Sequence, residues 1–211
     1  MKTTIYLIRH GETEANLSNT YVGHTDALLT EKGRLQAKTA AEYFKNIHAD
    51  FIYSSDLSRA FETALCTASL KGMEVIKDVR FREMYGGKWE NLKIEDIAKK
   101  YPDEYDIWCN DVGRLHCVGG ESVGDVQERI ISALTDIAEE HKGKTIFVFC
   151  HAAVIRFTSA KLYGMTPEET KALPWASNAS STVIEYENGK FTVKDYGYDK
   201  YMGKLTTYVN F

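Results

Sequence analysis

Two basic side chains, Arg9 and His10, directly follow a short apolar run at residues 5–8. An apolar run that stops at polar residues is typical of a buried strand that delivers side chains to its carboxyl end. A guanidinium can form paired, charge-assisted hydrogen bonds to an oxyanion, and an imidazole can act as a nucleophile. The opening stretch therefore predicts an anion-binding site.

The same residue types follow two later apolar runs. Arg59 comes within about one helical turn of the run at 51–53, and His151 directly follows the run at 145–150. In an open parallel sheet, ligands bind outside the carboxyl ends of the strands. We therefore expect Arg59 and His151 to face one crevice together with the opening basic pair, and such a pocket suits a phosphate group.

Phosphoryl transfer suggests a role for each group. A neutral His10 could attack phosphorus and form a phosphohistidine, while the arginines and a protonated second histidine stabilise the equatorial oxygens. An acid must also protonate the leaving alcohol, and Glu83 is a suitable group, with Glu62, Glu90 and Glu121 as alternatives. This scheme requires no metal and no cofactor.

The elements that must position these groups alternate between strand and helix. In the first half we expect a strand at 5–8, a helix at 31–46 after a Thr30 cap, a strand at 51–53, a helix at 57–70 and a strand at 74–76. In the second half we expect a helix opened by Ser122 and Asp125, a strand at 145–150, a helix at 152–163 and strands at 181–186 and 191–196 joined by an Asn188-Gly189 turn. This alternation predicts a mostly parallel sheet covered by helices.

The pattern changes between residues 80 and 120, where glycines and aromatic residues surround one short helix at 92–100. We interpret this segment as an insertion over the end of the sheet. Its aromatic side chains Tyr85, Trp89 and Trp108 either form local core or build a lid over the leaving group.

Length and charge limit the class of protein. A chain of 211 residues predicts a single domain, 1–211. The mild net charge of −4 does not indicate the excess of basic residues that binding to nucleic acid or to an anionic membrane requires. Residues 1–4 leave no room for a signal peptide before the first strand, and no apolar stretch is long enough to span a bilayer. The four cysteines are scattered, which favours a reduced, cytoplasmic setting.

Five ordered blocks of this sequence resemble the histidine phosphatase superfamily, the phosphoglycerate mutase-like proteins. The blocks are Leu7-Ile8-Arg9-His10-Gly11-Glu12-Thr13 with Asn16 and the stretch from Tyr21 to Ala37, then Ser54 to Ala64, Glu83 to Glu90, Gly120-Glu121-Ser122, and His151 with Val154-Ile155-Arg156. Five blocks in order are far more specific than any single motif.

The resemblance implies a three-layer α/β/α sandwich and a set of site residues. It implies His10 as the phosphorylated nucleophile, Glu83 as the proton donor and Asn16 near the transferred phosphate. The phosphate pocket would consist of Arg9, Arg59 and His151. One departure is that Ala152 and Ala153 follow the second histidine, where the family often has two glycines.

Three further substrate contacts are expected, at Gly23 in a matched block, at His24 in a loop that could reach the pocket, and at Ala152 beside the second histidine. His116 could also reach the pocket from its loop. The tyrosines near the end of the chain are interpreted as packing or a subunit contact, which leaves a homodimer open; they are Tyr196, Tyr198, Tyr201 and Tyr208.

We conclude from the sequence that the chain is a metal-independent phosphatase acting on a small phosphorylated metabolite. The first alternative is a phosphoglycerate mutase, which returns the phosphoryl group to substrate. The resemblance implies that true mutases carry a longer insertion that shields the phosphoenzyme, so the modest segment at 80–120 favours access of water and hydrolysis. The second alternative is a non-catalytic module that binds a phosphorylated ligand. The sequence does not identify the substrate.

Overall fold

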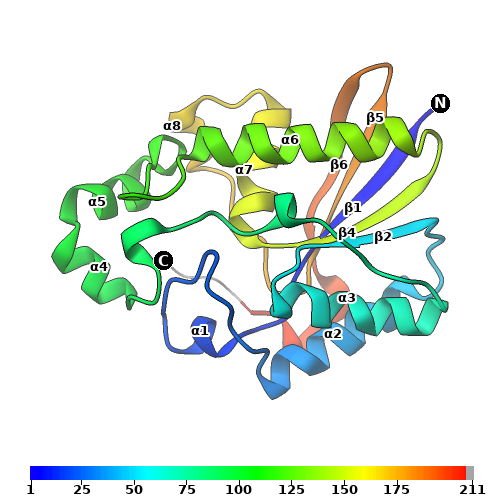
Figure 1. Ribbon diagram of the computed structural model, residues 1–211, viewed down its shortest axis with the longest axis horizontal. Helices are drawn as coiled ribbons and strands as arrows, with labels where there is room; N and C mark the ends of the chain where they lie inside the picture. The colour runs from blue at the N-terminus through cyan, green and yellow to red at the C-terminus, as the bar shows by residue number, and fades with distance from the viewer. Residues whose placement is uncertain (208–211) are drawn as a thin grey trace.

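A six-stranded sheet forms the centre of the computed structural model, which describes residues 1–207 (Figure 1). The strand order is β3-β2-β4-β1-β5-β6. The strands are β1 (Thr3–Arg9), β2 (Phe51–Ser54), β3 (Ile76–Lys77), β4 (Thr145–Cys150), β5 (Ser181–Glu187) and β6 (Lys190–Tyr198). Neighbours among β3, β2, β4 and β1 pair in parallel, whereas β5 runs antiparallel to both β1 and β6. The expected mostly parallel sheet is confirmed.

Helices cover both faces of this sheet. The α-helices are α1 (Glu14–Leu17), α2 (Glu31–Phe44), α3 (Ser58–Lys71), α4 (Ile94–Lys100), α5 (Pro102–Asn110), α6 (Val123–Glu140), α7 (Ala152–Tyr163) and α8 (Pro167–Thr170). Short 3₁₀ helices are η1 (Val79–Phe81), η2 (Gly87–Trp89), η3 (Val112–Arg114) and η4 (Lys200–Leu205). Helices α6 and α7 lie on one face and α2 and α3 on the other, which gives the three-layer α/β/α sandwich (Figure 1).

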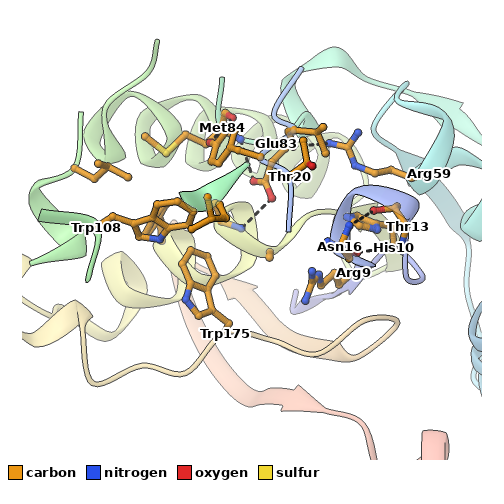
Figure 2. Close-up of a pocket in the computed structure, with 17 residues that line it drawn as sticks. Arg9, His10, Thr13, Asn16, Thr20, Arg59, Glu83, Met84, Trp108 and Trp175 are labelled. Atoms are coloured by element: carbon orange, nitrogen blue, oxygen red, sulfur yellow. Dashed lines mark hydrogen bonds between the residues drawn. The ribbon is translucent and has the colours of Figure 1, made fainter. Parts of the chain in front are cut away.

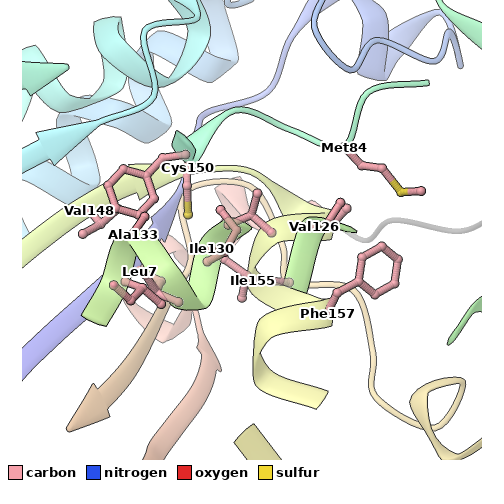
Figure 3. Packing of buried hydrophobic residues seen from close by; sticks show 14 of the residues in the cluster. Leu7, Met84, Val126, Ile130, Ala133, Val148, Cys150, Ile155 and Phe157 are labelled. Carbon is pink, nitrogen blue, oxygen red and sulfur yellow. The ribbon is translucent and has the colours of Figure 1, made fainter. Parts of the chain in front are cut away.

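The alternation of side chains along the buried strands supplies both cores. In β4, Ile146, Val148 and Cys150 pack with α6 and α7, whereas Phe147 and Phe149 pack with α2 and α3. Successive side chains of a strand point to opposite faces, so a strand that is buried on both sides must be apolar throughout. Figure 3 shows the first of these cores, where side chains of β1, β4, α6 and α7 meet.

Several helix boundaries follow from caps that the sequence carries. Thr30 accepts a hydrogen bond from the Gly33 amide at 2.9 Å, and Ser122 forms a reciprocal capping box with Asp125. Helix α6 is the longest helix, with one apolar face. Between residues 1 and 207, the structure contains no helix of the length and apolarity that a bilayer crossing requires.

Other boundaries differ from the sequence-based expectations. The third strand is Ile76–Lys77 and not 74–76, because only these two residues pair with β2, opposite Tyr53 and Ser54. The single helix expected at 92–100 begins at Ile94, and a second helix, α5, follows because Pro102 starts a new helix at its first position. The short helices α1 and α8 were not predicted, since four residues carry too little periodicity to detect.

The tyrosines near the end of the described chain contribute to packing. Tyr201 stacks on Tyr43 with ring centroids 4.1 Å apart, and Tyr196 donates a hydrogen bond to the Pro174 carbonyl at 2.6 Å. Tyr208 lies outside the described residues. A subunit contact of these side chains stays a prediction.

A close backbone approach fixes the loop after β1 against α2. A Cβ atom on Gly33 would lie 2.0 Å from the Glu12 carbonyl oxygen, and one on Gly11 would lie 2.3 Å from the Gly33 carbonyl oxygen. The neighbouring Glu12 amide donates to the Gln36 side chain of α2 at 2.7 Å. The segment that carries Arg9 and His10 therefore has little freedom to shift.

Replacing Gly33 with alanine tests this constraint. We expect Gly33→Ala to lower the free energy of unfolding by about 1–3 kcal/mol, because the added methyl group has no space against the backbone. The matched control is Gly124→Ala in α6, where the nearest atom would be 3.6 Å away. Alanine there should leave stability unchanged or raise it by up to about 1 kcal/mol. Equal chemical denaturation midpoints for both variants would contradict the proposed constraint.

Candidate active site

A pocket of about 680 Å³, a volume that includes its open mouth, lies at the carboxyl ends of β1, β2 and β4 (Figure 2). Its polar lining includes Arg9, His10, Asn16, Arg59 and Glu83. The remaining lining residues are Thr13, Thr20, Tyr21, Val22, Met84, Ile94, Trp108, Leu115, Ala152, Ala153, Phe157 and Trp175. The expected convergence of strand ends therefore produces one polar, concave site.

The ring of His10 has a defined orientation. Its Nδ1 lies 2.6 Å from the Gly11 carbonyl oxygen, and a carbonyl oxygen can only accept a hydrogen bond. Nδ1 therefore carries the proton, and Nε2 of the neutral ring keeps its lone pair. Burial, followed by the positive charges of Arg59 and Arg9, holds the pKa of His10 well below its ordinary value of 6.5. His10 is consequently neutral and nucleophilic at neutral pH.

His151 shows the opposite ring arrangement. Its Nδ1 lies 3.2 Å from Nε of Arg59, and because a guanidinium can only donate, Nδ1 accepts. The neutral ring then carries its proton on Nε2, which is buried and has no hydrogen-bond partner. Burial and the charge of Arg59 lower the pKa of His151 well below 6.5. This histidine thus offers a donor while uncharged, which differs from the protonated state that phosphate binding suggested from the sequence.

The two histidines lie together at the base of the pocket. Their ring centroids are 5.2 Å apart, with planes inclined by 59°. His151 itself is fully buried and is not among the residues that line the pocket. His10 follows β1 and His151 follows β4, and the His10 amide donates to the Cys150 carbonyl at 3.1 Å. The parallel pairing of these strands therefore sets the distance between the rings.

Arg9 brings a buried positive charge with an unused donor. Its Nη1 donates to the Ala176 carbonyl at 2.6 Å, whereas its buried Nε has no partner. Burial lowers the pKa of Arg9 to about 10, so the guanidinium stays charged at neutral pH. A buried donor without a partner is costly, and an oxyanion in the pocket would relieve this cost.

Arg59 is buried and anchors the loop that follows α1. It donates to the Thr25 carbonyl at 3.0 Å and to the Gly23 carbonyl at 2.8 Å, in addition to His151. Its guanidinium lines the pocket, and Asp26 lies 3.9 Å from Nη1. Arg59 therefore joins the pocket wall to the second histidine. Its contact with a phosphate oxygen stays a prediction.

Glu83 is a buried carboxyl group on the opposite wall. It accepts hydrogen bonds from the Met84 amide at 2.9 Å and from the Ala153 amide in the first turn of α7 at 3.3 Å. Desolvation outweighs these bonds and the nearby arginines, so burial raises the pKa of Glu83. Figure 2 shows Glu83 between Trp108 and the basic group of Arg9, His10 and Arg59. A carboxyl group with a raised pKa in this place can supply a proton.

The other predicted contacts divide into two groups. Asn16 and Ala152 line the pocket, and Asn16 Oδ1 accepts from the Thr13 amide at 3.1 Å. Gly23 and His24 do not line the pocket, and their backbone amides donate to the Glu90 carboxylate. The His24 ring instead faces Tyr85, with centroids 5.0 Å apart. Substrate contact at Gly23 and His24 stays a prediction.

Of the remaining sequence-based candidates, Trp108 lines the pocket, whereas His116, Glu62, Glu90 and Glu121 do not. His116 pairs its backbone with Ser122, and Glu62 forms an exposed ion pair with Arg34. Among the aromatic residues of the insertion, Trp89 is fully buried core, whereas Trp108 reaches the pocket. The insertion therefore contributes both local core and pocket wall.

Trp175 and Asn178 are among the residues of the site that sequence reasoning missed. Trp175 lines the pocket from the segment before β5. Asn178, in the same segment, donates from Nδ2 to the His10 carbonyl and to Asn16 Oδ1, both at 3.2 Å. A polar and aromatic stretch between a helix and a strand was the available signal, but it carries no diagnostic spacing.

Comparison with known proteins gives matches over nearly the whole chain. The model of the histidine phosphatase superfamily (branch 1) matches residues 5–199. Phosphoserine phosphatase 1 of Hydrogenobacter thermophilus is 34% identical over 183 residues, which cover 87% of this chain and 86% of that protein.

Solved structures agree with this match. The structure of Bacillus stearothermophilus YhfR has a TM-score of 0.90 and 30% identity, covering 95% of this chain and 99% of that chain. The native structure of mycobacterial glucosyl-3-phosphoglycerate phosphatase Rv2419c has a TM-score of 0.86 and 27% identity, covering 94% and 100% respectively.

Inorganic phosphate should stabilise the folded protein, because the pocket presents unpaired donors to an oxyanion. At a phosphate concentration about 100 times its dissociation constant, the free energy of unfolding should rise by about 2.7 kcal/mol, which corresponds to a rise in Tm of about 5–10 °C. Arg9→Gln should weaken this effect so that at least about tenfold more phosphate is needed. The control Arg34→Gln changes an exposed arginine paired with Glu62 and should respond like the wild type. Equal phosphate responses in all three proteins, measured by differential scanning fluorimetry, would contradict an oxyanion site at Arg9.

Proposed function

The chain belongs to branch 1 of the histidine phosphatase superfamily, and from this membership we propose that it hydrolyses small phosphate monoesters through a phosphohistidine at His10. The observation that carries the proposal is the free Nε2 of a neutral His10 beside unpaired donors on Arg9 and His151. The reaction class is that of a phosphoric monoester hydrolase. The names of the similar phosphatases support it.

In the first step, the lone pair of His10 Nε2 attacks phosphorus. A nitrogen–phosphorus bond forms while the ester oxygen–phosphorus bond breaks, and the bonding electrons leave with the alcohol oxygen. Glu83, in its protonated form, gives that oxygen a proton. Arg9 and the Nε2–H of His151 stabilise the negative charge on the equatorial oxygens.

In the second step, water attacks phosphorus opposite His10. The Glu83 carboxylate accepts a proton from this water, and the nitrogen–phosphorus bond breaks with its electrons returning to His10. Orthophosphate leaves and Glu83 is protonated again, so both groups return to their starting states. The raised pKa of Glu83 suits a group that must alternate between acid and base.

A phosphoglycerate mutase would use the same first step and give the phosphoryl group to a second substrate molecule. Hydrolysis is favoured because the segment at 80–120 is modest and leaves the pocket mouth open to water. Purified protein should therefore release orthophosphate from an aryl phosphate and from 3-phosphoglycerate. Mutase turnover with a bisphosphate primer and negligible orthophosphate would overturn the proposal, and binding without any turnover would favour the non-catalytic module.

The loss of activity in Glu83→Gln should depend on the leaving group of the ester. The variant should lose about 10²–10⁴-fold in kcat/KM on an alkyl phosphate, whose alkoxide needs a proton, and much less on p-nitrophenyl phosphate. In the wild type, kcat/KM for the alkyl ester should fall as pH rises through the pKa of Glu83, because only the protonated form is an acid. This basic limb should be absent in Glu83→Gln.

A matched control is Glu62→Gln, which changes an exposed carboxylate outside the pocket. It should retain the wild-type pH profile. Equal losses of Glu83→Gln on both esters would exclude Glu83 as the acid.

A further inference from the structure

A second cavity adjoins the active-site pocket. Both cavities share Trp108 and Trp175 as lining residues, and the second also includes Ala176, whose carbonyl accepts the hydrogen bond from Arg9. Its empty volume, about 1180 Å³ with the open mouth, exceeds that of the first pocket. Figure 2 shows the two tryptophans at the end of the pocket away from Arg59. The alcohol portion of a substrate could therefore extend past these rings.

Arg156 is the principal polar group of this second cavity. It lies on α7, the helix that His151 begins, and its side chain is 5% exposed. The guanidinium carbon lies 4.2 Å above the Trp175 ring, and Nη2 donates to the Thr170 and Lys171 carbonyls at 3.2 and 3.3 Å. Nε is buried without a partner. The charge is therefore held in place while part of its donor capacity stays unused.

The charged side chains that line this cavity are Arg156, Lys171 and Asp199. The Ser177 hydroxyl donates a hydrogen bond to Asp199 Oδ2 at 2.7 Å, and Lys171 Nζ donates to Asn110 Oδ1 at 3.4 Å. No carboxylate forms an ion pair with Arg156 among residues 1–207. Two cations and one occupied carboxylate leave the cavity with an excess of positive charge.

We propose that the second cavity binds an additional oxyanion on the alcohol portion of the substrate, with Arg156 as its main ligand. The preferred substrates are then monoesters that carry a carboxylate or a second phosphate beyond the ester. This inference rests on the proposed phosphatase function, and it assigns Arg156 a role in specificity. Lys171 adds a favourable charge, and Asp199 opposes it.

Matched esters test this proposal. Glycerol 3-phosphate and 3-phosphoglycerate share the phosphate ester and differ in a distal hydroxymethyl or carboxylate group. Fructose 6-phosphate and fructose 1,6-bisphosphate provide the corresponding pair for a second phosphate. The readout is the ratio of kcat/KM within each pair, anionic over neutral, and the pair with the larger ratio identifies the oxyanion.

Variants should move this ratio in opposite directions. We expect Arg156→Gln to lower it at least about tenfold, Arg156→Lys to lower it less, and Asp199→Asn to raise it about two- to threefold. Asp199→Asn keeps the oxygen that accepts from Ser177, so its fold should be intact. The control Arg114→Gln changes an exposed arginine that pairs with Asp111 and Glu168 outside the cavity, and its ratio should equal that of the wild type.

A ratio of binding affinities for the same pairs of esters can be measured without catalysis. It is obtained from the concentration of each ester that protects His10→Ala against thermal unfolding. If Arg156→Gln does not fold, Asp199→Asn and Arg156→Lys still report on the cavity. A purely structural role of Arg156 predicts unchanged ratios in all variants that fold, and this result would overturn the inference. Absence of hydrolysis in the wild type, with the binding ratios intact, would overturn the phosphatase proposal alone.

Discussion

Two guanidinium groups buried beside two imidazoles form the constraint on which the site depends. Arg9 and Arg59 are 3% and 1% exposed, and Glu83 is the only carboxyl group that lines the pocket within the described chain. Burial, followed by the positive charge of Arg59, lowers the pKa of both His10 and His151, which keeps both rings neutral. The same excess charge favours binding of an oxyanion, so one electrostatic arrangement explains both the nucleophile and its ligand.

Hydrogen bonds to fixed neighbours determine which ring nitrogen of each histidine carries the proton. The Gly11 carbonyl holds the proton on Nδ1 of His10, and Arg59 holds the proton of His151 on Nε2. Both histidines follow strands that pair in parallel, and Asn178 Nδ2 donates a hydrogen bond to the His10 carbonyl. Catalytic groups held by strands and by such neighbours lose little entropy when the substrate binds.

Sequence reasoning predicted the elements whose signals are local. The strand before Arg9 and His10, the caps at Thr30 and Ser122 and the antiparallel last pair of strands are confirmed. The convergence of strand ends followed from the general position of sites in parallel sheets. By contrast, Trp175 and Asn178 reach the site through the path of the segment between α8 and β5, and periodicity carries no information about that path. The tautomers also required the partner atoms to be known.

The central claim is covalent transfer to His10, and trapping the intermediate tests it most directly. Wild-type protein would be mixed with p-nitrophenyl phosphate, quenched within the first turnover under alkaline conditions and mapped by tandem mass spectrometry. We expect an acid-labile phosphoryl group on His10 that is absent from His10→Ala. Turnover of the ester with no phosphorylated His10, or with phosphorylation of His151 in its place, would contradict this account.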